Sequence, residues 1–295
     1  MNKLVGFLLG LSCLVGGIGM AAAQDPSSGS MKPPKVLVLY REFLKPGKQG
    51  ASHEKTESAF VQAVTKAKWA QHYFDVDSLS GRPRSLFLFP YDSFDAWEKD
   101  YLAGQKNPAL GAQLDRAGVA DGELLSDADS TVLSYREDQS LNADGSIAKM
   151  RYFEISLYQV RAGHRHEWDE LVKLVKDAYT KVPDSHWAMY EVAYGQQPNT
   201  TYVIFHALKS AAEIDTFASQ DKAFAEAMGE DGMKKLGELE SSAIEARQSN
   251  LFVFNPRMSY PPDEWIKEDP DFWKPKTMAP MMPKKPAAEK PAGPQ

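Results

Sequence analysis

The stretch PGKQGASHE, residues 46–54, follows an apolar run, and AGHRHEW, residues 162–168, follows another apolar run later in the chain. Further pairs of identical residues continue this correspondence in the same order along both halves. These pairs are Gly47 with Gly163, His53-Glu54 with His166-Glu167, His72 with His186, Gly81 with Gly195, and Gly122 with Gly237. An ordered series of this kind is typical of a diverged internal duplication.

Both halves also show the same succession of hydrophobic periodicities. In the first half an apolar strand pattern is followed by a helical pattern, a hairpin, a second helical region and a last strand. The corresponding ranges are 35–43, 52–70, 72–91, 93 onward and 130–138. The second half repeats this order at 151–160, 166–182, 186–208, 211–246 and 250–255. Each half is therefore predicted to be a β-α-β-β-α-β unit of the ferredoxin-like type.

The strands indicate how the two units meet. LFLF (86–89), YVIF (202–205) and LFVF (251–254) are apolar on both sides, whereas a sheet with one face in water shows alternation. Helices of the same unit can cover one face, and the sheet of the other unit can cover the second. We therefore expect an α+β fold with two tandem ferredoxin-like units packed sheet to sheet as an α/β barrel, with a ligand cavity between the sheets.

The chain divides into seven parts by composition. We expect a signal peptide at 1–23, a linker at 24–34, the first unit at 35–138, a linker at 139–149, the second unit at 150–257, a packed strap at 258–275 and a disordered tail at 276–295. The strap carries Trp265, Phe272 and Trp273, which favours packing on the body. The tail is rich in Pro, Ala and Lys and has no aromatic residue, so it offers little apolar surface to bury.

The N-terminus predicts export to the periplasm or the exterior. Lys3 precedes an apolar run and then Ala21-Ala22-Ala23, which is the pattern of a cleaved signal peptide. The apolar run is shorter than the roughly 20 residues of a spanning helix, so we expect no membrane span. The single cysteine, Cys13, lies in this segment, which excludes disulfides and thiol chemistry in the mature chain.

Charge limits the partners of the protein. The formal net charge is -6, and the folded part has no basic block, which argues against nucleic-acid binding. The lysines of the tail could make weak contacts with anionic envelope polymers. A small-molecule ligand is the partner that the barrel hypothesis predicts.

One known superfamily resembles this chain. YREFLKPGKQG (40–50), in which a strand runs into Leu-Lys-Pro-Gly-Lys before a helix, resembles the dimeric α/β-barrel superfamily and especially its NIPSNAP-like branch. YQVRAGHRHEW (158–168) is a looser copy. The resemblance implies ferredoxin-like units that pair as a barrel, here in tandem. The superfamily includes cofactor-free monooxygenases, haem-handling enzymes and isomerases, so the resemblance does not transfer one reaction.

Polar residues that interrupt apolar strands are the candidate catalytic groups. They are Glu154, Tyr158, Asp75 and Glu191, and Asp77 shares a strand face with Asp75. If that face is the barrel interior, desolvation raises the pKa values of the carboxyls and makes one of them a general base. Tyr158 would orient a ligand oxygen.

Histidines provide an alternative hypothesis. His72 and His186 begin corresponding strands and His206 ends another, so these three could hold haem or a metal ion. We interpret His53-Glu54 and His166-Glu167 structurally, as openings of helices where Glu favours the helix dipole. His164 and His166 are two residues apart and point to different sides of a helix, which disfavours shared ligation. We expect no metal site and no essential cofactor.

These observations favour an exported protein that binds a small, mostly apolar organic ligand between its two sheets, with cofactor-free proton transfer or oxygenation as the enzymatic version. A haem or metal binder that uses the barrel histidines is one alternative. A non-catalytic envelope protein that acts through its surface and tail is another. No serine elbow, phosphate loop or His-Glu-x-x-His pattern is present.

Overall fold

The computed structural model describes residues 32–197 and 200–274 of the 295-residue chain. The first unit consists of β1 (Val36–Leu44), α1 (Ala51–Ala67), β2 (Tyr73–Ser78), β3 (Arg84–Tyr91), α2 (Phe94–Gln105), α3 (Pro108–Gly122) and β4 (Leu125–Tyr135). The second consists of β5 (Tyr152–Val160), α4 (Arg165–Tyr179), β6 (Ala188–Tyr194), β7 (Thr201–Leu208), α5 (Phe217–Ala243) and β8 (Ile244–Tyr260). Two short 3-10 turns are also present, η1 (Glu137–Gln139) between the units and η2 (Ala211–Thr216) before α5. The helices α6 (Asp263–Glu268) and α7 (Pro270–Trp273) follow β8.

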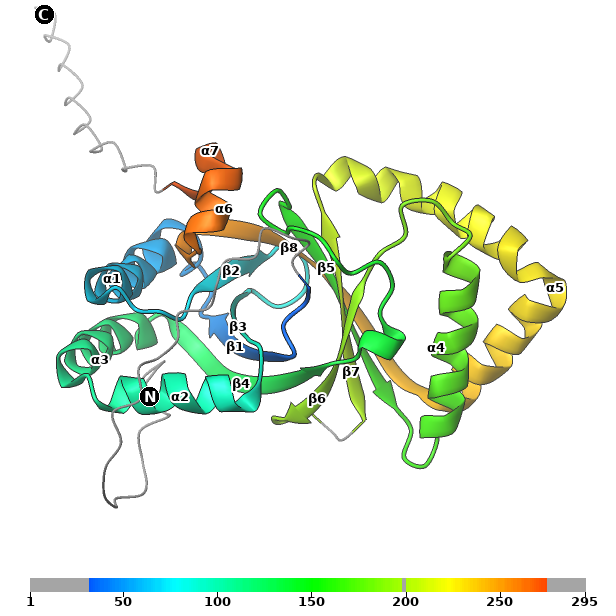
Figure 1. Ribbon diagram of the computed structural model, residues 1–295, viewed down its shortest axis with the longest axis horizontal. Helices are drawn as coiled ribbons and strands as arrows, with labels where there is room; N and C mark the ends of the chain where they lie inside the picture. Colours follow the sequence, from blue (N-terminus) through cyan, green and yellow to red (C-terminus); the bar gives the residue numbers. More distant parts are fainter. Residues whose placement is uncertain (1–31, 198–199, 275–295) are drawn as a thin grey trace, which may run out of the picture.

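The eight strands form one closed antiparallel barrel, in the order β1-β3-β2-β8-β5-β7-β6-β4 (Figure 1). Within each unit the last strand pairs with the first, the first with the third, and the third with the second. The pairs β2–β8 and β4–β6 join the two units along their edges. The predicted fold class is therefore confirmed, and the closed ring leaves no free sheet edge.

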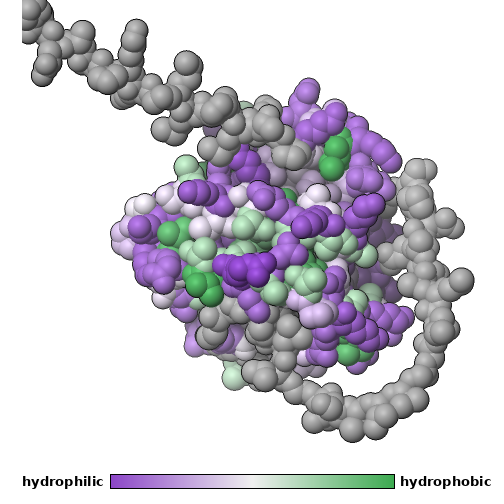
Figure 2. Space-filling model, turned by 90° about the vertical axis from the view of Figure 1, so that its left-hand side faces the viewer, coloured by the Kyte–Doolittle hydropathy of each residue, from purple (hydrophilic) through white to green (hydrophobic). Residues whose placement is uncertain are grey.

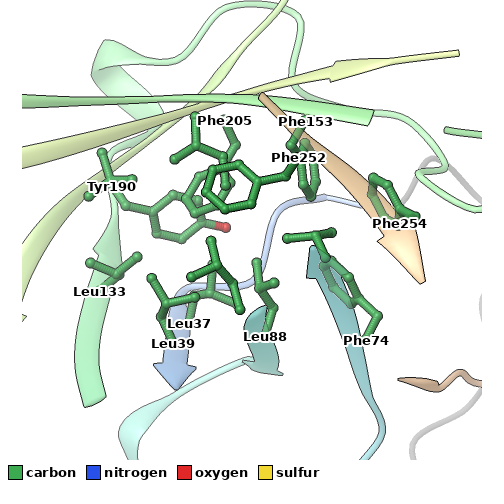
Figure 3. Packing of buried hydrophobic residues seen from close by; sticks show 14 of the residues in the cluster. Leu37, Leu39, Phe74, Leu88, Leu133, Phe153, Tyr190, Phe205, Phe252 and Phe254 are labelled. Atoms are coloured by element: carbon green, nitrogen blue, oxygen red, sulfur yellow. The ribbon is translucent and has the colours of Figure 1, made fainter. Parts of the chain in front are cut away.

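The interior of the barrel is a shared hydrophobic core. Figure 3 shows side chains of both units pointing toward one another, among them Leu37, Leu88, Phe153, Phe205 and Phe254. The rings of Phe153 and Phe254 lie 4.7 Å apart between centroids. The sheets thus bury their apolar faces against each other, as the strand composition predicted. These side chains fill part of the space between the sheets, and several of them, among them Leu37, Phe153 and Phe205, also line a cavity of about 1160 Å³ that remains there.

Helices cover the outer face of each sheet. In the first unit α1 and α3 pack beside one another on this face, and α2 lies beside α3 (Figure 1). In the second unit the space between sheet and helices is filled by an apolar cluster that includes Trp168, Tyr202, Leu236 and Leu239. In the first unit the corresponding apolar cluster includes Phe60, Val64, Phe87 and Leu114.

The C-terminal helices belong to the barrel core. Trp265 and Trp273 of α6 and α7 are 5% and 1% exposed and pack with the interior side chains. The indole of Trp273 donates a hydrogen bond to the carbonyl oxygen of Ala148, at 2.7 Å. The preceding strand, β8, runs from Ile244 to Tyr260, so it begins before the predicted end of the helix at Ala246 and continues past 257. The helical pattern of α5 and the strand pattern of β8 overlap between 244 and 246, so the predicted helix extended into the strand.

The surface of the first unit is mixed in character. Figure 2, which views the helical side of this unit, shows hydrophobic side chains in small areas among hydrophilic ones. None of the helices in the described ranges combines the length and apolarity needed to cross a bilayer. The predicted signal peptide (1–23) and tail (276–295) lie outside the described residues.

Candidate functional site

Four ionisable side chains meet between the first sheet and its helices. They come from three elements: Glu42 from β1, His53 and Glu57 from α1, and Asp121 from α3. Each is at most 1% exposed. His53 and Glu57 are one helical turn apart and face the sheet, and Glu42 alternates with the inward residues of its strand, so it points outward toward α1. We call these four residues the His–carboxylate cluster.

The histidine is oriented by groups outside this cluster. The Ser85 hydroxyl donates to Asp77 at 2.5 Å and lies 3.3 Å from Nδ1 of His53. With the serine proton directed at Asp77, the tautomer that satisfies the serine oxygen is the one in which Nδ1 donates to it, and in that tautomer the lone pair of the neutral ring is on Nε2. Metal-binding histidines are commonly held in this way through their second ring nitrogen. The Nε2 atom faces the three carboxylates.

The distances around Nε2 fit a coordination sphere. The nearest oxygens of Glu42, Asp121 and Glu57 lie 3.0, 3.4 and 3.8 Å from Nε2. Two ligands that each lie about 2.1 Å from one ion, at angles of about 90–130°, are about 3.0–3.8 Å apart. One ligand atom from each of the four residues falls within 4.8 Å of all the others. A small inward movement would place all four around a single ion.

Burial controls the protonation of the cluster. It raises the pKa of the Glu42 carboxyl well above its usual range, and the negative charge of Asp121 raises that pKa further. Three carboxylates this close cannot all remain ionised in a dehydrated site without a compensating charge. A proton on Glu42, donated to Nε2, is one solution, and a bound cation is the other. Thr56 also donates to Asp121, at 2.7 Å.

An apolar cavity of about 110 Å³ adjoins the cluster. It lies between the outer face of β1–β3 and the helices α1, α2 and α3. Glu57 lines the cavity and also belongs to the cluster. Most of the remaining wall is aromatic or aliphatic: Val38, Tyr40, Phe60, Val64, Trp69, Tyr73, Phe87, Phe89, Tyr91, Trp97, Tyr101, Leu110 and Leu114. The polar residues of the wall are Glu57, on the side of the cluster, and Gln71, Asp100 and Gln105.

The candidates predicted on the strands point away from the barrel interior. Their neighbours Phe74 and Phe153 belong to the interior core, so Asp75, Glu154 and Tyr158 face outward. Asp75 is fully buried, Glu154 lies 3.7 Å from His206, and the Tyr158 ring packs 5.4 Å from Trp168. The condition on which their catalytic role depended, that this strand face turns toward the barrel interior, is not met. Strands that are apolar on both sides do not show from sequence which face turns inward.

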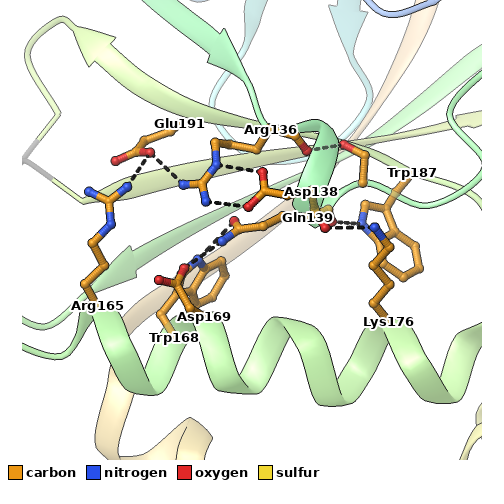
Figure 4. Close-up of polar contacts among 10 residues, drawn as sticks. Arg136, Asp138, Gln139, Arg165, Trp168, Asp169, Lys176, Trp187 and Glu191 are labelled. Carbon is orange, nitrogen blue, oxygen red and sulfur yellow. Dashed lines mark hydrogen bonds and ion pairs between the residues drawn. The ribbon is translucent and has the colours of Figure 1, made fainter.

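Glu191 also lies on the outer side of the barrel. It accepts hydrogen bonds from Arg136 and Arg165, both at 2.8 Å (Figure 4). Its neighbour Tyr190 is part of the interior core. The four predicted catalytic residues therefore do not converge on one site, and Glu191 forms part of an ion-pair network between β6 and α4.

The three predicted haem or metal histidines line a different cavity. His72, His186 and His206 border an opening of about 1160 Å³ at one mouth of the barrel, between the two sheets. The rings of His186 and His206 are 4.8 Å apart between centroids. Both nitrogens of His186 lie 2.8 Å from carbonyl oxygens, of Asp184 and Ala207, so ligation by His186 would require it to give up one of these contacts. Haem binding there stays a prediction.

The His–carboxylate cluster was missed from sequence, although part of its signal is visible. His53 and Glu57 have i, i+4 spacing, and Glu42 interrupts an apolar strand. Asp121 stands far along the chain and has no motif that connects it to them. Glu54, which we assigned to the helix dipole, accepts a hydrogen bond from Arg257 at 2.8 Å. His164 precedes α4 and His166 is exposed, and the structure gives them no shared site.

Comparisons with known proteins add structural neighbours only. No protein-family model matches the sequence, and a search of curated proteins found no match. A candidate monooxygenase from Fusobacterium nucleatum is 10% identical, with a TM-score of 0.49 over 76% of this chain and 94% of that one. An anthrone oxidase-like protein is 13% identical, with a TM-score of 0.48 over 77% and 93%.

A mutant chlorite dismutase from Candidatus Nitrospira defluvii, in complex with cyanide, is 11% identical to this chain. Its TM-score is 0.45 over 80% of this chain and 95% of that one. Likeness at this level carries no activity, substrate or cofactor over to the protein described here.

Proposed function

We propose that this protein binds one divalent transition-metal ion between Glu42, His53, Glu57 and Asp121, and holds a small apolar molecule beside that ion. The observation that carries the proposal is the position of Glu57, which belongs to the cluster and also lines the cavity. A ligand in the cavity would therefore lie next to the ion. The orientation of His53 by Ser85 and Asp77 supports the same assignment.

The ligand set favours particular ions. One imidazole nitrogen with three carboxylates is a mixed nitrogen and oxygen set, which suits Mn²⁺, Fe²⁺ or Zn²⁺. Ca²⁺ and Mg²⁺ prefer oxygen alone. Because carboxylates must lose their protons to bind metal, the raised pKa of Glu42 is consistent with a site that exchanges a proton for a cation.

The chemistry that such a centre supports is activation of an oxygen atom. A divalent ion lowers the pKa of a bound water or hydroxyl group and polarises a carbonyl. The apolar wall excludes water from the neighbouring space and strengthens these electrostatic effects. We therefore assign the reaction class as proton transfer from a small organic substrate whose carbonyl or hydroxyl oxygen would lie beside the ion.

A second candidate function is metal-free proton transfer. It is favoured by the hydrogen-bonded chain from Asp77 through Ser85 to His53 and Glu42. This chain would exchange protons between the partly exposed Asp77 and the buried cluster, and Glu57 would act on the ligand as general base. The enzymatic function predicted from sequence was also proton transfer, but with Glu154, Asp75 or Glu191 as the general base.

Metal analysis decides between the two functions. The full chain, purified without chelator, is examined by inductively coupled plasma mass spectrometry and then titrated with Mn²⁺, Zn²⁺ and Mg²⁺. We expect one ion per chain and binding of Mn²⁺ and Zn²⁺ in preference to Mg²⁺. Absence of metal together with no saturable binding of Mn²⁺ or Zn²⁺ would overturn the metal function and leave the proton-transfer function.

We also propose that the chain is exported, which rests on the N-terminal pattern of Lys3, an apolar run and Ala21-Ala22-Ala23. N-terminal sequencing of the protein isolated from its source is expected to begin at Gln24. Recovery of a chain that begins at Met1 would contradict this.

A further inference from the structure

We infer that the cavity beside the His–carboxylate cluster selects monocyclic aromatic molecules that carry a hydroxyl group, that is, phenols with one ring. This inference rests on the proposed function, since it names the ligand class of the same site. Its test does not depend on a bound metal ion.

Size sets the first limit on the ligand. The cavity measures about 110 Å³. An engineered apolar cavity of about 150 Å³ in another protein stays dry and binds benzene. A space about a quarter smaller than that limits the ligand to no more than one six-membered ring and excludes fused rings and long alkyl chains. The rigid strands beneath the cavity cannot yield without breaking barrel hydrogen bonds.

The walls set the second limit. Side chains such as Phe60, Tyr73 and Phe89 present ring faces and edges around the cavity, and the rings of Tyr73 and Phe89 stack 4.9 Å apart. A planar ring can be packed edge to face against such walls, which adds to the energy of burial. A saturated ring of similar volume gains burial without this directional contact. Aromatic ligands are therefore favoured over aliphatic ones.

The polar groups set the third limit. Glu57 lines the cavity from the cluster side, and Tyr40 lines it nearby. Tyr40 precedes Glu42 by two residues on β1, so the two side chains share the strand face that carries the cluster. At another point of the wall Asp100 accepts hydrogen bonds from Trp69 and Tyr91, both at 2.9 Å. A single hydroxyl directed at Glu57 therefore has an acceptor, while the rest of the ring meets apolar surface.

Helix α2 forms the outer wall of the cavity. None of its side chains is buried, although Trp97 and Tyr101 line the cavity. Asp100 of the same helix joins it to the rest of the unit through Trp69 and Tyr91.

The test compares four probes, namely phenol, benzene, cyclohexane and 1-naphthol. Binding to the full chain is measured by isothermal titration calorimetry and by ligand-observed NMR, both after dialysis against EDTA and with Zn²⁺ added. We expect phenol to bind more tightly than benzene, and both to bind more tightly than cyclohexane and 1-naphthol. Equal or stronger binding of cyclohexane or 1-naphthol would overturn the inference, as would absence of phenol binding in both states.

Two glycine variants locate the binding. Gly111 lines the cavity, and a Cβ atom built there meets nothing within 4 Å, so Gly111→Leu directs a side chain into open space. It is expected to weaken phenol binding at least tenfold. Gly237→Leu, on helix α5 of the second unit and equally unhindered but away from the cavity and the cluster, is the matched control and should bind normally. Phenol binding that survives Gly111→Leu would place the ligand elsewhere and overturn the inference. Loss of metal binding with phenol binding intact would instead overturn the proposed function alone.

Discussion

Replacing His53 by alanine is expected to lower the affinity for Zn²⁺ or Mn²⁺ at least a hundredfold. His53 supplies the only nitrogen ligand of the cluster, and its Nε2 atom lies within 3.8 Å of all three carboxylate groups. Loss of an outer-shell partner already costs about 10–100-fold in metal affinity, so loss of a ligand should cost more. Competition with a chromophoric chelator measures the change, and unaltered affinity would remove the cluster as the binding site.

Two conservative variants test the remaining ligands without opening a large cavity. Glu57→Gln and Asp121→Asn keep the side-chain volume and remove one negative charge each, and both are expected to weaken metal binding by a similar factor. The matched control is Glu154→Gln. Glu154 also lies near a histidine, His206, but on the outer face of the second unit. Equal losses in the control and the cluster variants would show a general electrostatic effect and contradict a specific site.

A variant of Ser85 tests how much the orientation of His53 contributes to metal binding, apart from the ligand itself. Ser85→Ala removes the hydroxyl between His53 and Asp77, so the imidazole loses the contact that fixes Nε2 toward the carboxylates. We expect a loss of about 10–100-fold in metal affinity, smaller than that of His53→Ala. Ser156→Ala is the control, because Ser156 is equally a strand serine and bonds to Ser249 in the second unit. Circular dichroism and thermal unfolding confirm that each variant folds.

The fold was predictable because its signals are local and occur twice. Paired landmarks such as Gly47 with Gly163, in constant order, indicated a duplication, and the periodicities within each half gave the order of strands and helices. Strands such as 251–254, apolar on both sides, then required a second sheet. The closed order of strands follows from joining two units of this kind at their edges.

The site was not predictable because it depends on which strand face turns inward. On β5 the alternation of Phe153 with Glu154 is compatible with either face until the opposite sheet is placed. The catalytic role of the carboxylates was conditional on the polar face turning inward, and in the structure the polar residues of β5 and Glu42 of β1 are on the outer face. Asp121 reaches the cluster only because α3 packs beside α1, which is a tertiary contact without a sequence signature.

Replacing Trp273 by alanine is expected to lower the free energy of unfolding by about 3–5 kcal/mol, the usual cost of removing a buried tryptophan. Trp273 is 1% exposed, its ring packs 5.0 Å from Trp265 and 6.2 Å from Phe254, and its N–H bonds to the carbonyl oxygen of Ala148. The substitution therefore opens a cavity and also removes the shorter of two side-chain hydrogen bonds to the Ala148 carbonyl oxygen, the other being donated by Arg151 at 3.3 Å. Denaturant titration followed by tryptophan fluorescence and circular dichroism measures the change.

Phe94→Ala is the control for this variant, since Phe94 is also aromatic but 43% exposed on α2, and its loss should cost much less. The comparison tests whether the last helices are part of the barrel. Strand β8 delivers α6 and α7 to the barrel mouth, where Trp265 and Trp273 complete a core begun by β-strands of both units. A large loss for Trp273→Ala with a single unfolding transition means that both units and the strap fold as one cooperative body. A loss similar to that of Phe94→Ala would mean that the barrel is stable without the strap, and that the mouth can open without unfolding.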